Sequence, residues 1–262
     1  MTPPLGFTGH LHDDVETAIS DVGVCQYDGI ELGSDSVIDE PDTVDTLLSK
    51  YDLELYCVMG SWLESDGNVT RIVDAVPTME RLGARYLGLL PPRRGLVSDE
   101  TFARWVDRIH AATDSIQPVI HHHGGTHVEQ PAEIEEWLSR TPRTVGLLYD
   151  PPHYAPYGDE IEAVSTFVDD IEYVHFRDLE MTPAFSDHAD RLTAGDFNID
   201  SVIDYFEAFV DLGDGTLDLP AIYDALDASG YDHPITLEIE NQYDDPLVHA
   251  KRNRDAFERL IE

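Results

Sequence analysis

Three consecutive histidines end an apolar run near the middle of the chain. Val119 and Ile120 lead into His121, His122 and His123, and two glycines follow directly. A short apolar run bounded in this way is typical of a buried strand, in which successive side chains point to opposite faces. We therefore expect His121 and His123 to share one face and His122 to take the other.

Later apolar segments also end in side chains that bind metals. Asp150 follows one segment, with His153 three residues beyond it, while His175 and Glu238 lie near the ends of two others. Each residue alone has a plain structural interpretation, but four successive segments with such an ending favour one divalent metal site. A mixed histidine and carboxylate set suits Mn, Co, Zn or Mg.

Other polar residues occupy comparable positions. Glu31 ends an early apolar segment, Arg177 follows His175, and Glu240 lies two residues beyond Glu238 and points the same way. Trp62 follows the third segment. The sequence leaves two roles equally open for its ring: stacking on a substrate and packing within a loop. The remaining histidines fall outside this pattern and are interpreted as structural or exposed; they include His10, His12, His110, His233 and His249.

Apolar segments alternate with amphipathic ones along the whole chain. The apolar segments are hydrophobic on both faces, as expected for parallel strands covered by helices. About eight such strand and helix units in about 250 residues predict a single (β/α)8 TIM barrel domain over residues 1–262. A doubly wound open sheet is the alternative, but no glycine-rich phosphate loop follows the first strand. The expected strands are 5–8, 29–32, 53–59, 86–90, the histidine segment, 145–149, 171–176 and 235–239.

Three local features refine this prediction. The connection over residues 178–218 is too long for a bare loop, and its apolar spacing indicates a short helix. Pro77 lies inside a helical pattern and is expected to kink or interrupt that helix. Gly230 follows the helical pattern that begins near Leu219, which makes it a plausible C-terminal cap.

The chain is strongly acidic. It has 53 Asp and Glu against 16 Lys and Arg, a formal net charge of -37, and Lys50 and Lys251 are its only lysines. Such a surface repels phosphate backbones and anionic lipids, which argues against nucleic acid and membrane partners. The acidic residues are scattered among apolar ones rather than gathered in a tail, so we interpret them as an adaptation to high salt.

Cysteine usage and hydropathy point to a cytoplasmic protein. Cys25 and Cys57 lie in separate segments, and no disulfide framework is indicated. The N-terminus lacks a basic region followed by an apolar run, and no apolar stretch approaches the roughly 18 residues that span a membrane. A homo-oligomer is compatible with the sequence.

Three stretches of the C-terminal half resemble the xylose isomerase-like barrel superfamily of sugar isomerases and epimerases. The N-terminal half matches only in general form. The matching stretches are residues 121–134, then 149–153 with 173–178, and finally 212–218 with 230–232 and 236–240.

This resemblance implies site roles. Asp150, His175 and Glu238 match the metal ligands of the family, His153 matches a substrate-binding residue, and Arg177 is expected near the polar end of the substrate. Many epimerases of the superfamily carry a glutamate at the fifth strand, where this chain has His121. That departure is similar to the inosose dehydratase branch. Endonuclease IV shares the fold, but the acidity of this chain argues against DNA.

The functional expectation is a metal-dependent enzyme acting on a keto-sugar or keto-cyclitol through an enediolate. His121, Asp150, His175 and Glu238 are the expected metal ligands. Reprotonation of the enediolate would give isomerisation or epimerisation, and loss of a β-hydroxyl would give dehydration. A non-catalytic sugar- or metal-binding barrel is the alternative of another class. The expected catalytic groups are Glu238, His153 and Glu240, and the expected substrate contacts are Glu31, Trp62, His123 and Arg177.

The net charge of -37 predicts a fold that depends on salt. Self-repulsion destabilises the compact state, and molar salt screens it within about 3 Å. We expect the Tm to rise substantially between dilute buffer and molar KCl or NaCl in thermal melts. An unchanged Tm would contradict the proposed adaptation to salt.

Overall fold

Parallel strands close into a barrel within the described residues of this computed structural model, 3–240 and 244–261. The order around the barrel is β1-β10-β7-β6-β5-β4-β3-β2. The closed sheet confirms the TIM barrel and excludes the open sheet. The strands are β1 (Leu5–Thr8), β2 (Gly29–Gly33), β3 (Glu54–Met59), β4 (Tyr86–Leu89), β5 (Gln117–His121), β6 (Gly146–Tyr149), β7 (Ile171–Phe176) and β10 (Ile235–Leu237).

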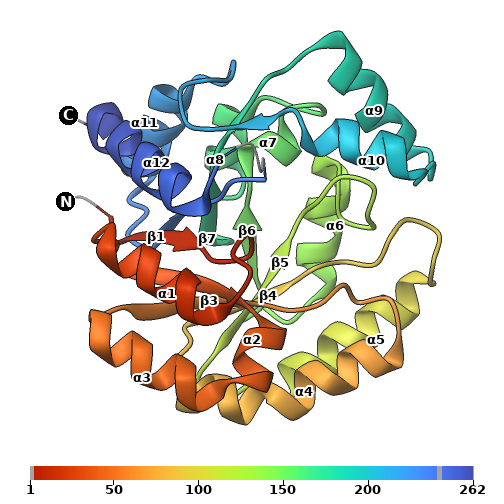
Figure 1. Cartoon of the computed structure of the whole chain (residues 1–262). Helices are drawn as coiled ribbons and strands as arrows, with labels where there is room; N and C mark the ends of the chain where they lie inside the picture. Colours follow the sequence, from red (N-terminus) through yellow and green to blue (C-terminus); the bar gives the residue numbers. More distant parts are fainter. Residues whose placement is uncertain (1–2, 241–243, 262) are drawn as a thin grey trace.

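Amphipathic helices surround the barrel (Figure 1). In α1, Asp14 caps the N-terminus by accepting from the Thr17 backbone N–H, and the predicted apolar stripe is buried. Two short helices, α2 (Ser34–Asp39) and α7 (Pro151–Tyr154), directly follow β2 and β6. No helix among the described residues is long and apolar enough to cross a membrane. The outer helices are α1 (Val15–Val24), α3 (Pro41–Tyr51), α4 (Asp66–Arg81), α5 (Asp99–His110), α6 (Pro131–Arg140), α8 (Glu160–Thr166), α11 (Leu219–Ser229) and α12 (Pro246–Ile261).

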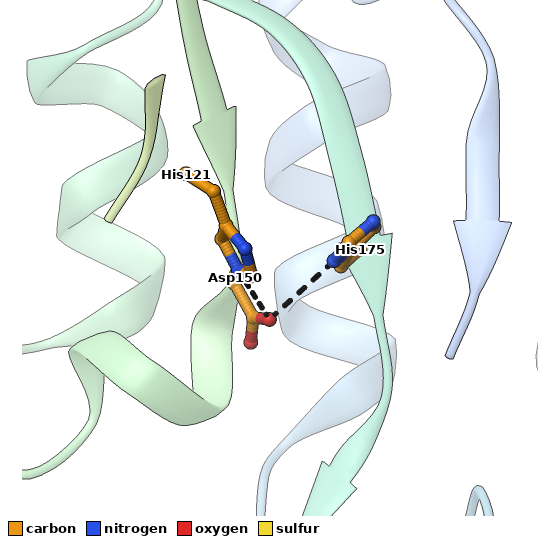
Figure 2. Close-up of side chains that lie close together, drawn as sticks. All are labelled: His121, Asp150 and His175. Carbon is orange, nitrogen blue, oxygen red and sulfur yellow. Dashed lines mark hydrogen bonds and ion pairs between the residues drawn. The ribbon is translucent and has the colours of Figure 1, made fainter. Parts of the chain in front are cut away.

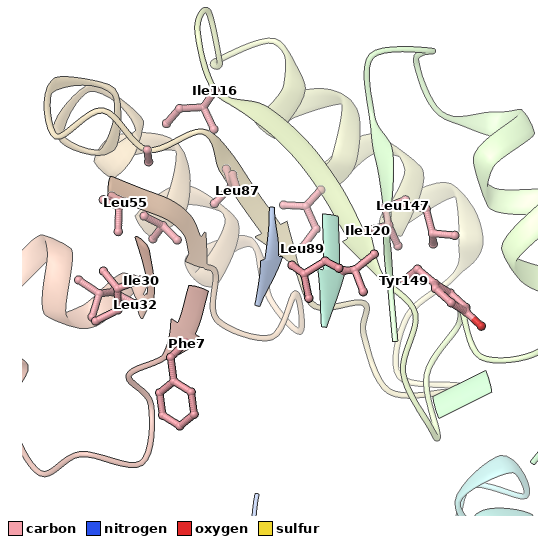
Figure 3. Close-up of a cluster of buried hydrophobic side chains, with 14 of the residues drawn as sticks. Phe7, Ile30, Leu32, Leu55, Leu87, Leu89, Ile116, Ile120, Leu147 and Tyr149 are labelled. Carbon is pink, nitrogen blue, oxygen red and sulfur yellow. The ribbon is translucent and has the colours of Figure 1, made fainter. Parts of the chain in front are cut away.

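Strand side chains alternate between two apolar layers. Outward-facing residues such as Leu87, Leu89 and Ile120 pack between the strands and the helices (Figure 3). Their neighbours point inward and fill the barrel interior, where the buried cluster includes Tyr86 and Val119. Because side chains alternate in direction along a strand, every second residue points to the barrel axis. This alternation continues past the last core residue of each strand.

The connection after β7 holds more structure than the single short helix expected. It contains α9 (Pro183–Thr193), α10 (Ile199–Phe206) and an antiparallel pair formed by β8 (Asp178–Leu179) and β9 (Phe209–Val210). Asp178 organises its far end by accepting the backbone N–H groups of Gly213 and Gly215, both at 3.0 Å. A Cβ at Gly215 would lie 2.2 Å from Asp178 Oδ1, so only glycine fits there.

Two helix predictions had different outcomes. Gly230 is confirmed as the C-cap of α11, with a left-handed φ of 83°. Pro77 does not interrupt α4, which runs through it from Asp66 to Arg81. The side chain of Pro77 is exposed, while Val76 and Met79 beside it are buried. Tertiary packing of the apolar stripe therefore maintains the helix despite the missing N–H.

Replacement of Pro77 should stabilise the protein. Pro77→Ala restores a backbone N–H in the interior of α4, and the gain is reduced by the greater freedom of the unfolded chain. We expect a net increase of about 1–2 kcal/mol in the free energy of unfolding, measured by urea titration in molar KCl. Pro41→Ala is the control, because Pro41 lies in the first turn of α3, where its missing N–H costs nothing. A lower midpoint for Pro77→Ala would show that the proline ring itself stabilises this site.

Candidate functional site

The predicted metal ligands lie at the C-terminal ends of four neighbouring strands. In the barrel, β5 pairs with β6, β6 with β7, and β7 with β10. Each ligand follows an inward-facing core residue by two positions, so the strand period aims it at the barrel axis. The pairs are Val119 and His121, Leu148 and Asp150, Tyr173 and His175, and Thr236 and Glu238.

Asp150 lies between two imidazoles (Figure 2). Its Oδ2 is 3.2 Å from His121 Nε2 and 3.8 Å from His175 Nδ1. His175 Nδ1 is also 3.0 Å from Glu238 Oε2. His121, Asp150 and His175 form one possible metal-binding group, and Glu238 joins His175 and Glu31 in a second. His175 therefore belongs to both groups.

The donor atoms at this site fit a divalent cation. Ligand bonds to zinc are about 2.0–2.2 Å long, which places neighbouring ligand atoms about 3–3.5 Å apart. The separations of 3.2 Å and 3.0 Å given above fall in this range, and that of 3.8 Å lies just beyond it. His175 Nδ1 is also buried without a hydrogen-bond partner among the described residues, and it faces Glu238 Oε2. A cation bound between these two atoms would give this imidazole nitrogen a partner.

Glu31 holds the other side of the His175 ring. Its Oε2 is 2.9 Å from His175 Nε2, across the barrel from β7. Burial opposes protonation of His175, but Glu238 and Glu31 outweigh it and hold its pKa well above the usual value. A carboxylate on the second nitrogen is the usual arrangement that orients a metal-binding histidine. Glu31, predicted as a substrate contact, lines the cavity and also positions His175.

Arg177 is fully buried beneath the candidate ligands. It donates from NH2 to Asp150 Oδ2 at 2.6 Å and forms ion pairs from NH1 to Glu238 and Glu240 at 3.0 Å and 3.1 Å. Burial raises the pKa of Asp150, but Arg177 together with the neighbouring histidines outweighs burial, and the net pKa is well below the usual value. Arg177, expected near the polar end of the substrate, thus contacts the ligand carboxylates directly.

His153 lies beside Arg177 and below the cavity surface. A guanidinium only donates, so His153 Nε2 accepts from Arg177 NH2 at 2.8 Å. His153 Nδ1–H then donates to the Tyr205 hydroxyl oxygen at 2.9 Å. Burial keeps the pKa of this imidazole well below its usual value. Both ring nitrogens are occupied, so His153 positions Arg177 here, whereas the sequence placed it among substrate-binding and catalytic residues.

The three histidines divide as the strand period predicts. His121 and His123 line the cavity, while His122 points away and its Nε2 accepts from the Asp150 backbone N–H at 3.0 Å. Burial lowers the pKa of His122 to about 3 and that of His123 to about 4, so both are neutral. His123 Nδ1 donates to the Gly124 carbonyl at 3.0 Å, and the Trp62 ring contacts the His123 ring edge-on.

Glu129 fixes the loop that follows the histidines. This buried carboxylate accepts from the Gly125 N–H at 2.7 Å and the Tyr157 hydroxyl at 2.7 Å. It also accepts from Thr193 of α9 at 2.9 Å and from Arg94 at 2.6 Å. Sequence reasoning missed this role, because three of the four donors, on Arg94, Tyr157 and Thr193, come from distant segments.

A cavity of about 680 Å³ opens above the candidate ligands. Its volume is in the range of small-molecule sites, about 300–1,000 Å³. Its lining combines carboxylates and imidazoles, including Glu238 and Glu240, with the aromatic rings of Trp62, Phe197 and Phe206. A mixed lining of this kind suits a ring that has polar edges and a less polar face.

His10 corrects one interpretation of the sequence. We expected it to lie away from the site, but it lines the cavity, and its Nε2 is 3.6 Å from Glu240 Oε2. The loop after β1 delivers it, and no periodicity in the sequence marks that loop. The other histidines interpreted as structural or exposed lie outside the cavity lining; His249, for example, is buried against Asp211 at 2.8 Å.

Residues 18–260 match the Xylose isomerase-like TIM barrel family, and the chain belongs to this family. The inosose dehydratase of Lacticaseibacillus casei is 36% identical over 129 residues, which cover 48% of this chain and 41% of that protein. In this match the chain spans about two fifths of the length of its relative. The inosose dehydratase of Histophilus somni is 24% identical over 297 residues, covering 98% of this chain and 95% of that one.

The fold is also that of solved structures. The structure of IOLI protein with a bound zinc atom superposes with a TM-score of 0.77 and 16% identity, covering 98% of both chains. At this identity the likeness concerns the fold. Together, the comparisons place the chain in the Xylose isomerase-like TIM barrel family, and the two relatives named here are inosose dehydratases.

Substitution of the candidate ligands should remove bound metal. We choose Asp150→Asn and His175→Gln, because alanine at position 150 would leave the buried Arg177 poorly paired. Each variant should lose metal affinity by at least the roughly 10–100-fold typical of changes around a metal site, measured by elemental analysis after dialysis. His233→Gln is the control, since His233 contacts Tyr86 outside the cavity lining. Full occupancy in both ligand variants would place the metal elsewhere.

Proposed function

We propose that this protein is a divalent-metal-dependent lyase that removes water from a polyhydroxylated cyclic ketone of the inosose type. The observation that carries the proposal is the set of His121, Asp150 and His175 at the floor of a cavity of small-molecule size. The end-to-end likeness to an inosose dehydratase supports the same reaction. Isomerisation or epimerisation of a keto-sugar is the second candidate, because it begins with the same enediolate.

The ligand set would hold one divalent ion, of Mn, Co, Zn or Mg, between His121, Asp150, His175 and Glu238. Such an ion would act as a Lewis acid that stabilises negative charge on the carbonyl oxygen of the substrate. The chain itself would supply the proton transfers. Glu238 lines the cavity and carries the carboxylate that would take the α-proton.

The remaining lining residues would orient the substrate. His123 and Glu240 present polar atoms to the cavity, and Trp62, which contacts the His123 ring edge-on, adds an aromatic ring to the lining. Glu31 keeps the His175 ring in place through its contact at 2.9 Å. A ring bound against Trp62 would be shielded from bulk water there, which strengthens its electrostatic interactions with the polar groups of the lining.

His121 favours dehydration over epimerisation. The epimerases that the sequence resembles carry a glutamate at this strand, which brings negative charge to the ion. With His121 the set holds two carboxylates, Asp150 and Glu238. An ion held by this set would therefore keep more positive charge, which would favour stabilisation of a departing hydroxyl as well as of an enediolate.

The proposal is tested by incubating metal-loaded protein in molar KCl and deuterated water with a panel of inososes and ketoses. We expect deuterium at the carbon next to the carbonyl and loss of water from an inosose, both followed by NMR. Asp150→Asn is the matched control and should show neither reaction. Exchange with epimerised products and no water loss would favour the second candidate. Metal binding without exchange on any compound would indicate a binding protein without turnover.

A further inference from the structure

His10 projects into the cavity from the loop after β1, on the side opposite His121. About a third of its side chain, 34%, is exposed, and it belongs to the cavity lining. The preceding residue is anchored, because the Gly9 N–H donates to the Glu31 carbonyl at 2.9 Å. The imidazole is therefore held at the cavity wall while one edge stays accessible to a bound molecule.

Glu240 pairs with His10 and is itself fixed. His10 Nε2 lies 3.6 Å from Glu240 Oε2, and the other oxygen of Glu240 accepts from Arg177 at 3.1 Å. A ring nitrogen of His10 and oxygens of Glu238 and Glu240 all lie within 4.8 Å of one another. A substrate oxygen next to Glu238 would therefore lie within hydrogen-bond reach of His10 after a small adjustment.

The other imidazole and guanidinium groups of the lining are engaged elsewhere in the described part of the chain. His123 donates to the Gly124 carbonyl, and His121 Nε2 contacts Asp150. Arg93 forms an ion pair with Glu64. His10 instead faces Glu240 and Glu238, with which it forms a third possible metal-binding group, and about a third of its side chain, 34%, stays exposed.

We propose that His10, held by Glu240, is the general acid that gives its proton to the departing hydroxyl of the substrate. This inference rests on the proposed dehydration. Glu238 takes the α-proton to give the enediolate, and collapse of the enediolate re-forms the carbonyl and makes the new C=C bond as the β-carbon–oxygen bond breaks. The hydroxyl leaves as water with the proton from His10. His10 then regains a proton from solvent, and Glu238 releases one to it. No oxidant or reductant is needed.

The charges around His10 favour the protonated form. Burial opposes it, but the contact with Glu240, together with Glu238 and Glu31, outweighs burial and raises the pKa of His10 above its usual value. Arg177 is the cation on this side, and it is paired with Glu240 and Glu238. The contact with Glu240 therefore favours the protonated imidazole that a general acid requires.

His10→Gln tests the assignment by separating the two halves of the reaction. With Mn²⁺-loaded protein and an inosose in deuterated water, the variant should keep its metal content and its exchange at the α-carbon within about threefold. Water loss should slow by about 10²-fold or more, the range typical of a general acid. His110→Gln is the matched control, because His110 lies on α5 and contacts Thr144 outside the cavity lining, and it should behave as wild type.

Two further measurements distinguish proton transfer from packing. Added imidazole should restore water loss in His10→Ala, which a merely structural role would not allow. In metal-free protein, NMR titration should give His10 a pKa above that of a free imidazole, and Glu240→Gln should lower it. The inference is overturned if water loss in His10→Gln is unchanged, or if exchange and water loss fall together. A wild-type protein without exchange or water loss would instead overturn the proposed function and this inference with it.

Discussion

The buried guanidinium of Arg177 offsets the negative charge of the carboxylates at the candidate site. Asp150, Glu238 and Glu240 converge on one end of the barrel, and each contacts Arg177 within 3.1 Å. Three carboxylates in so small a volume would otherwise repel one another and take up protons, because burial penalises the charged form. Arg177 keeps them ionised and fixed in direction before any cation binds. Its aliphatic stem and planar head are sealed by the Phe209 ring, 4.3 Å away.

The protein neutralises its interior and its surface by different means. Buried acids have assigned partners within the chain: Glu129 accepts from Arg94, and Asp211 contacts both His249 and Arg252. These pairs use two of the 16 Lys and Arg residues, Arg94 and Arg252, against 53 acidic ones in the whole sequence. The remaining carboxylates depend on solvent cations, which screen them over a distance set by ionic strength. We therefore propose that salt acts on the carboxylates at the protein surface. The candidate site keeps its geometry through the cationic side chains buried beside it.

Sequence reasoning was most effective where one local rule decides the outcome. The strand period identifies His121, Asp150, His175 and Glu238, because each lies two positions beyond an inward core residue and the parallel barrel aligns the strand ends. The same rule does not identify His10, because His10 lies on a loop without periodicity. Glu129, the helix α9 and strand pair after β7, and the contact between His153 and Tyr205 also escaped prediction, because they depend on segments that meet only in the folded chain.

The inserted helices connect the cavity wall to the candidate ligands. Tyr205 of α10 accepts from His153, His153 accepts from Arg177, and Arg177 donates to Asp150, so three hydrogen bonds lead from the insertion to the centre. Gly124 accommodates this chain of contacts, because a Cβ there would lie 2.6 Å from the Tyr205 hydroxyl oxygen. The neighbouring Phe206 lines the cavity. Helix α10 thus lines the cavity and also holds Asp150 in place through His153 and Arg177. Changes in α10 that alter the cavity should therefore also disturb the orientation of Asp150.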